Sequence, residues 1–245
     1  MTTMLVTRPL PDALETAARL EALDIRPVIF PLLRHVTLPT SLPSPAGFAA
    51  LALTSTAALR ALEERRVLER YRDLPVFAVG NRTAAEARAR GFGRAESAGG
   101  TFADLVALLA GAGLDGPVFY PAARHQSGDL AHALAPHGIM VVTSRVYEMA
   151  TVDRFSGEVA AALGDGSIDA VLFYSRRTAG AFVACAGAAH LSRAVRARLG
   201  ALCIAESVAE PLVAAQFVRI GLADHPDEEA MMALALSFAR DQNAT

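Results

Sequence analysis

Several residue types and motifs are missing from this chain of 245 residues, and each absence excludes a class of chemistry. All 23 basic residues are arginine, because the sequence contains no lysine. A lysine Schiff base and the phosphate-binding lysine of P-loop proteins are therefore both impossible. No G-x-S-x-G segment occurs either, so a Ser/His/Asp triad of the hydrolase type cannot be assigned. The sequence gives no support for a nucleotide cofactor.

Charge of one sign is also lacking, since acidic and basic residues nearly balance at a net charge of -2. No basic field favours nucleic acid or a membrane surface, so local groups would have to hold any anionic ligand. A hydrophobic content of 53% with 20% charged residues is typical of a folded globular protein. We therefore expect neither nucleic-acid nor membrane partners.

Cysteines, targeting signals and long apolar runs are scarce. Cys185 and Cys203 have no C-x-x-C spacing and no nearby histidine pair, so we interpret them as buried small residues and expect no metal site. The longest apolar stretches, near 48–53 and 230–236, fall far short of the roughly 20 residues that span a bilayer. Residues 1–20 lack a basic region followed by an apolar run, which predicts a cytoplasmic protein.

One outline of segments occurs twice along the chain. An apolar strand-like segment ending in Thr54-Ser55 is followed by a second one ending in Val79-Gly80. After residue 165, segments ending in Tyr174-Ser175 and Ile204-Ala205 follow in the same order. Two similar α/β halves predict a ligand cleft between them.

Strand patterns alternate with helix patterns, which predicts parallel sheets covered on both faces. The expected strands are 4–7, 26–31, 48–54, 75–79, 117–120, 139–143, 168–173 and 201–205. The expected helices are 11–23, 56–64, 82–90, 102–110, 127–136, 178–186, 191–198, 207–215 and 228–240.

Two extended segments, 31–39 and 144–151, mirror each other, and a Pro/Ser-rich stretch follows the first of them. In one economical arrangement the chain leaves a first domain near residue 34, builds a second, and returns near residue 148. The order of the segments does not prove this. The predicted first domain is 1–34 with 150–245, the second is 39–143, and the linker strands are 35–38 and 144–149.

Polar residues stand where predicted strands end and helices begin. This edge of a parallel sheet is where ligands bind, and the first turn of a helix offers unpaired N–H groups to carboxylate or phosphate. A serine or threonine at such a position can also simply cap its helix. Four such positions in duplicate favour a shared anionic ligand: Ser55, Gly80 to Thr83, Ser175 and Ser207.

Three further residues have two interpretations each. Gly80 either permits a turn or lets a ligand approach the backbone closely. Arg8 and Arg124 follow predicted strands, where a guanidinium could bind a carboxylate, although isolated arginines are more often surface residues.

An ordered set of short segments resembles the uroporphyrinogen-III synthase family. Each segment alone is weak, but their order over nearly the whole chain is specific. The segments are Leu5-Val-Thr7-Arg8-Pro9, Thr54-Ser55, Val79-Gly80-Asn-Arg-Thr83-Ala84, Val146-Tyr147-Glu148 and Phe173-Tyr-Ser175.

The resemblance implies two flavodoxin-like α/β domains joined by a two-stranded linker, the first domain being discontinuous. It implies cyclisation of hydroxymethylbilane with inversion of ring D and loss of water, the work of a carbon–oxygen hydro-lyase in haem biosynthesis that needs no cofactor. We expect a monomer. By resemblance, Tyr147 is the proton donor to the departing hydroxyl. The expected substrate-binding residues are Thr7, Arg8, Thr54, Ser55, Gly80, Thr83, Arg124, Ser175 and Ser207.

This chain departs from the family pattern in two places. Ile204-Ala205-Glu206-Ser207 stands where the family commonly has Ile-Gly-x-Thr, and Glu206 brings a negative charge toward a carboxylate-rich ligand. The glycine and basic residue that often follow the strand at 117–120 are represented by the segment 122–127, which contains Arg124.

Two other kinds of protein fit parts of the pattern. A non-catalytic two-domain cytoplasmic protein that binds a polycarboxylate would use the same helix termini, although we find no DNA-binding segment of the kind such proteins usually carry. A two-half racemase needs one cysteine in each half. Cys185 and Cys203 both fall in the last third of the chain, which disfavours the racemase.

Overall fold

The computed structural model describes residues 1–126 and 128–243 of the chain. The fold divides into two compact units: unit 1 comprises Met1–Arg34 and Ala150–Thr245, and unit 2 comprises His35–Met149. Among the described residues, no helix is long and apolar enough to cross a membrane.

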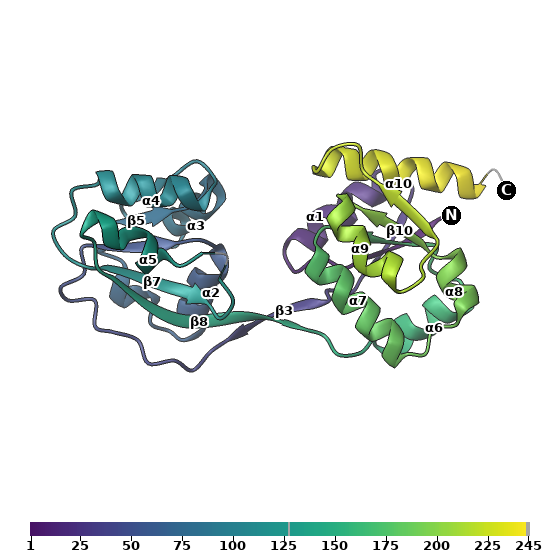
Figure 1. Cartoon of the computed structure of the whole chain (residues 1–245), viewed down its shortest axis with the longest axis horizontal. Helices are drawn as coiled ribbons and strands as arrows, with labels where there is room; N and C mark the ends of the chain where they lie inside the picture. The colour runs from purple at the N-terminus through teal and green to yellow at the C-terminus, as the bar shows by residue number, and fades with distance from the viewer. Residues whose placement is uncertain (127, 244–245) are drawn as a thin grey trace. The chain divides into compact units, whose positions relative to one another are not determined.

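Unit 1 contains a five-stranded sheet in the order β11-β10-β9-β1-β2, and its paired strands are parallel (Figure 1). Numbered along this unit, the order is 2-1-3-4-5, that of flavodoxin. The three inner strands are buried on both faces, which explains their continuous apolar runs. The strands are β1 (Thr3–Val6), β2 (Arg26–Ile29), β9 (Ala170–Phe173), β10 (Gly200–Cys203) and β11 (Arg219–Leu222).

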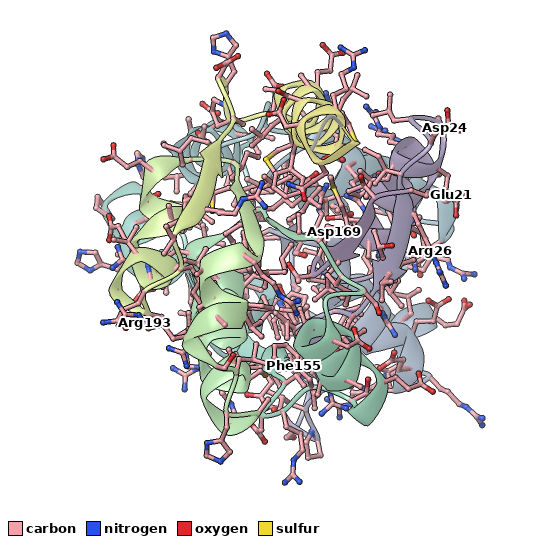
Figure 2. All side chains as sticks on the ribbon, turned by 90° about the vertical axis from the view of Figure 1, so that its right-hand side faces the viewer. Glu21, Asp24, Arg26, Phe155, Asp169 and Arg193 are labelled. Carbon is pink, nitrogen blue, oxygen red and sulfur yellow. The ribbon has the colours of Figure 1, made fainter. Side chains whose placement is uncertain are left out.

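Helices cover both faces of this sheet. On one face, Leu5, Val171 and Phe173 pack against α6 (Gly157–Asp165), α7 (Arg176–Ala188), α8 (Arg193–Arg198) and α9 (Glu206–Ala214). On the other face, Met4, Val6 and Leu172 pack against α1 (Asp12–Glu21) and α10 (Glu228–Asn243). Phe155, beside α6 and α7 in Figure 2, meets Phe182 with ring centroids 5.2 Å apart.

Unit 2 contains a six-stranded sheet in the order β3-β8-β7-β4-β5-β6. From β4 onward the strands follow the doubly wound order 3-2-1-4-5, so the order reverses between β4 and β7. Thus both units are doubly wound, with different strand orders. The strands are β3 (Leu33–Thr37), β4 (Ala50–Leu53), β5 (Val76–Ala78), β6 (Ala95–Ser97), β7 (Val118–Ala123) and β8 (Val141–Thr151).

The sheet of unit 2 is also covered on both faces. Leu51, Leu53 and Phe119 pack against α2 (Thr56–Glu64), the 3-10 turn η1 (Leu68–Tyr71) and α3 (Asn81–Ala89). Ala50, Ala52 and Tyr120 pack against α4 (Phe102–Gly111) and α5 (Leu130–Leu134). This arrangement confirms the predicted α/β class with parallel sheets.

Some predicted elements differ from the structure. The helix predicted at 127–136 is α5 followed by the turn η2 (Ala135–His137), because Pro136 lacks the N–H that a continued helix needs; Ser127 lies outside the described residues. The strand predicted at 139–143 and the extended segment after it form one strand, β8. The sequence did not predict β6, β11, α6 or the 3-10 turn η1. The two strands are short and only partly buried, and α6 begins with glycine.

Candidate functional site

Tyr147 owes its orientation to an irregularity in β8. Ala122 of β7 pairs with Arg145, but the next residue, Ala123, pairs with Tyr147, so β8 carries one extra residue. Side chains of a regular strand alternate between faces, and a bulge turns one of them. As a result, Val146 and Tyr147 are both buried in the core on the α2 side.

The phenol of Tyr147 lies beside Ser55, the residue that precedes α2. Tyr147 is 5% exposed, and its ring stacks on the His35 ring with centroids 5.5 Å apart. Burial raises the pKa of Tyr147, and a hydrogen bond with Ser55 partly offsets this rise. The phenol is therefore protonated at neutral pH and able to donate.

Ser55 is the N-cap of α2. It has an extended backbone, and its hydroxyl accepts a hydrogen bond from the Ala57 N–H at 3.2 Å. This is the expected capping role. The same hydroxyl also interacts with Tyr147, so capping is not its only contact.

Thr54 and Tyr120 form a second hydroxyl pair at this edge of unit 2. Their side-chain oxygens are 3.0 Å apart, and burial raises the pKa of Tyr120. Thr54 follows β4 and Tyr120 lies in β7, the two strands between which the strand order reverses. The carboxyl ends of strands at such a reversal are the usual ligand position in doubly wound folds.

Gly80 is the N-cap of α3, without a side-chain cap. Its φ of -148° is extended backbone that any residue adopts, and an added Cβ would lie 3.8 Å from the Gly100 Cα, an ordinary contact. Neither turn geometry nor crowding within the chain therefore requires glycine here. Thr83, in the first turn of α3, is 6% exposed.

Arg124 is exposed, and its guanidinium already has a carboxylate partner. Its Nη1 lies 2.8 Å from Glu148 Oε2, and its backbone N–H donates to the Tyr147 carbonyl at 2.8 Å. A substrate carboxylate would therefore compete with Glu148 for this guanidinium.

In unit 1, Arg8 lies where β1 ends, as the sequence suggests, but it is bound to protein carboxylates. Its Nη1 lies 2.5 Å from Glu228 Oε2 and its Nη2 3.4 Å from Asp12 Oδ2. The guanidinium also lies over the Tyr174 ring at 4.1 Å.

Glu228 brings this cluster together. Its Oε1 accepts hydrogen bonds from Thr16 at 2.9 Å and from Tyr174 at 3.1 Å. Burial and the Glu228 charge raise the pKa of Tyr174. Arg8 is therefore paired with a carboxylate of the protein itself, and the sequence did not predict this ion pair.

The remaining predicted residues of unit 1 have different surroundings. Thr7 is fully buried, and its hydroxyl donates to the Leu172 carbonyl at 2.7 Å, which ties β1 to β9. Ser175 caps α7 by accepting from the Thr178 N–H at 3.1 Å. Ser207 is exposed in the first turn of α9, whose N-cap is Ala205 without a side-chain cap.

Sequence reasoning missed His35 and Glu228. No motif marks either residue, and both contacts join segments far apart along the chain. Cys185 and Cys203 are buried free thiols, as predicted, and burial raises the pKa of Cys203 to about 12.

The structure also bears on two kinds of ligand, nucleotides and metal ions. The segment Gly111-Ala-Gly113-Leu-Asp-Gly116 does match G-x-G-x-x-G, but it runs from α4 into β7. The nucleotide-binding motif instead runs from a strand into a helix, so this match is coincidental. Within residues 1–126 and 128–243, no group of three or more His, Cys, Asp or Glu side chains is arranged to hold a metal ion.

These features define a class: proteins of two doubly wound α/β units that present hydroxyl, phenol and arginine side chains at the carboxyl ends of their strands. The chain belongs to the uroporphyrinogen-III synthase family. A family model described as Uroporphyrinogen-III synthase HemD matches residues 15–233. Family membership confirms the predicted synthase reading and leaves the non-catalytic alternative without support.

Solved structures show the same fold. Uroporphyrinogen-III synthetase from Helicobacter pylori 26695 is 22% identical with a TM-score of 0.63, over 97% of this chain and 99% of that chain. A mutant uroporphyrinogen III synthase from the extreme thermophile Thermus thermophilus is 19% identical with a TM-score of 0.54, over 100% of both chains. Among curated proteins, no sequence matches the chain significantly.

Proposed function

We propose that this protein cyclises hydroxymethylbilane to uroporphyrinogen III with inversion of ring D, as a carbon–oxygen hydro-lyase. Membership of the synthase family supports the reaction. The observation that carries the proposal for this chain is the Tyr147 phenol, buried beside Ser55 at the carboxyl edge of unit 2.

Tyr147 donates its proton to the hydroxyl that leaves ring A, and the hydroxyl departs as water. The pyrrole nitrogen supplies the electron pair, which leaves an electrophilic azafulvene. The substituted carbon of ring D attacks it, and the resulting spiro intermediate rearranges with ring D inverted. The proton lost when the pyrrole is restored returns to the phenolate, so one water is the net loss. A raised pKa keeps Tyr147 protonated for this task.

The chemical step needs little acid–base power, so positioning supplies most of the acceleration. The enzyme must hold rings A and D in the inverting geometry faster than the bilane closes to the uninverted isomer. It must also shield the cation-like intermediate from water. For this reason we propose that no metal or organic cofactor takes part.

Substrate carboxylates suit helix N-termini and hydroxyl groups, which bind anions without a net positive charge. In unit 2 we propose Thr54, Ser55 and the Gly80 backbone as contacts, since all three lie at the carboxyl edge of the sheet. In unit 1 we propose Ser175 for the same reason.

The other predicted residues keep secondary places in the proposal. Arg8 and Arg124 would bind a substrate carboxylate only by exchanging the protein carboxylates they now hold. Thr7 and Thr83 are buried and would act by holding the strand end and the helix start. Ser207 is exposed at the start of α9. A cytoplasmic monomer is part of the same proposal.

Product analysis tests the proposed function. Purified protein is mixed with hydroxymethylbilane in the presence of a chelator, and the oxidised products are separated by chromatography. The type III isomer in excess over an enzyme-free control is the expected result. Binding of the bilane with only the type I isomer formed would instead identify a non-catalytic binding protein.

A further inference from the structure

The imidazole of His35 packs face to face against the ring of Tyr147. The two ring planes are 20° apart with centroids at 5.5 Å, and the His35 side chain is 6% exposed. His35 lies in β3 and Tyr147 in β8, which are neighbours in the sheet. The stack therefore covers one face of the proposed proton donor.

His35 also bonds to the first turn of α2. Its Nε2 lies 3.1 Å from the Ala57 carbonyl oxygen. A carbonyl only accepts, so Nε2 carries the proton of the neutral ring. Ala57 is the second residue of α2, directly after the N-cap Ser55 and Thr56. His35 thus connects the ring of Tyr147 to the start of α2, where Ser55, the partner of the Tyr147 hydroxyl, is the N-cap.

The other ring nitrogen of His35 has no hydrogen-bond partner among the residues that the structure describes. Nδ1 is buried and lies 3.8 Å from Glu64 Oε2, with an acceptor facing an acceptor when the ring is neutral. Glu64 is held in turn by Thr37 and Arg60. Burial lowers the pKa of His35, with a smaller contribution from the Arg60 charge, whereas Ala57 and Glu64 oppose the shift.

Packing alone does not account for a histidine at this position. A phenylalanine would fill the stack against Tyr147 without leaving a buried polar atom unpaired, and unpaired buried atoms are costly. The bond from Nε2 to Ala57 is what the imidazole adds.

We propose that His35 is a positioning residue for the cyclisation: its stack and its bond to α2 hold the Tyr147 phenol beside Ser55 in the orientation that donates the proton. This inference rests on the proposed function of Tyr147. His35 touches no reacting atom, so its loss lowers kcat and leaves KM nearly unchanged.

Two variants of similar bulk separate the two contacts. His35→Phe keeps the stack and removes the bond to Ala57, whereas His35→Gln keeps a donor and removes the stack. We expect each to lower kcat about 10-fold with KM within about twofold, because a small misplacement of a reacting group is costly. His137→Gln, at an exposed histidine of the same unit, is the control and should leave both constants unchanged.

A second measurement does not depend on turnover. The four tyrosines are labelled with carbon-13 at Cζ, and the Tyr147 resonance is assigned by its loss in Tyr147→Phe. In both His35 variants we expect the Tyr147 resonance to shift, because the phenol no longer keeps its place beside Ser55, whereas the resonances of Tyr71 and Tyr174 should stay unmoved.

The outcomes separate the two proposals. If Tyr147→Phe lowers kcat but both His35 variants keep wild-type kcat and an unmoved Tyr147 resonance, the positioning role is wrong and the function of Tyr147 stands. If Tyr147→Phe has wild-type turnover, the proposed function of Tyr147 and the catalytic role of His35 fail together. If the two His35 variants lost thermal stability but kept wild-type kcat and the Tyr147 resonance, His35 would have a structural role only.

Discussion

Replacing Tyr147 with phenylalanine removes one oxygen atom and tests the proposed proton donor directly. The ring remains, so the stack on His35 and the packing in the core stay in place. The Ser55 hydroxyl loses its phenol partner but keeps the Ala57 N–H, so stability should fall by only about 1 kcal/mol, the net value of one hydrogen bond.

The effect on turnover should be much larger than the effect on stability. A positioned general acid contributes typically 10²–10⁴-fold. Here water can partly replace the donor, and positioning supplies the rest of the acceleration, so we expect kcat to fall by about 10²-fold at most without being abolished. The assay is the initial rate of type III formation from hydroxymethylbilane, corrected for spontaneous closure.

Tyr71→Phe is the matched control. Tyr71 is another buried tyrosine of the same core, and its hydroxyl donates to the Pro43 carbonyl at 2.6 Å rather than to the site. It should lose similar stability and keep wild-type turnover. If folded Tyr147→Phe kept the wild-type rate, or if both variants lost activity equally, Tyr147 would be a packing residue and the proton-donor reasoning would be refuted.

Three further perturbations follow from the contacts. Ser55→Ala should cost about 1 kcal/mol of stability, as a lost N-cap does, and should also lower turnover. Ser156→Ala, which removes the N-cap of α6, should cost similar stability and leave turnover unchanged. Equal turnover of the two variants would refute a role for Ser55 beyond capping. Arg8→Met should lower the free energy of unfolding by about 1–2 kcal/mol, because Glu228 loses its charged partner. The control Arg193→Met, at an exposed site labelled in Figure 2, should change it by less than about 0.5 kcal/mol. If urea unfolding showed wild-type stability for Arg8→Met, the pairing would be contradicted. Folding lowers the pKa of His35, so the unfolded chain binds the imidazole proton more readily than the folded protein does. The free energy of unfolding of wild type should therefore exceed that of His35→Gln by a full, constant amount above about pH 6.5, and the excess should decline at lower pH. An excess that grows on acidification would show the opposite pKa shift.

Regular elements could be predicted because their signals are local. The boundaries of α2, Thr56–Glu64, follow from an apolar face and a serine N-cap, and the buried inner strands follow from short apolar runs. The edge strands β6 and β11 escaped because they are half-exposed and carry little apolar pattern. Their presence depends on pairing with a neighbour, which no local pattern records.

The contacts of the candidate site residues were harder to predict than the elements that carry them. Family resemblance pointed to Tyr147, but its burial on the α2 side depends on a bulge in β8 that no periodicity indicates. Arg8 stands at the predicted strand end, yet its state is decided by Glu228, 220 residues further along the chain. The stack of His35 on Tyr147 likewise depends on strand neighbours and not on spacing.

The central claim is that this chain directs ring closure toward the inverted isomer, and a titration of the protein against spontaneous closure measures this most directly. A fixed amount of hydroxymethylbilane is allowed to react completely at increasing protein concentrations, with chelator present, and the fraction of type III isomer is determined by chromatography. We predict that the fraction rises from the enzyme-free value until type III is nearly the sole product. A product that stays type I at every concentration of folded protein would contradict the account.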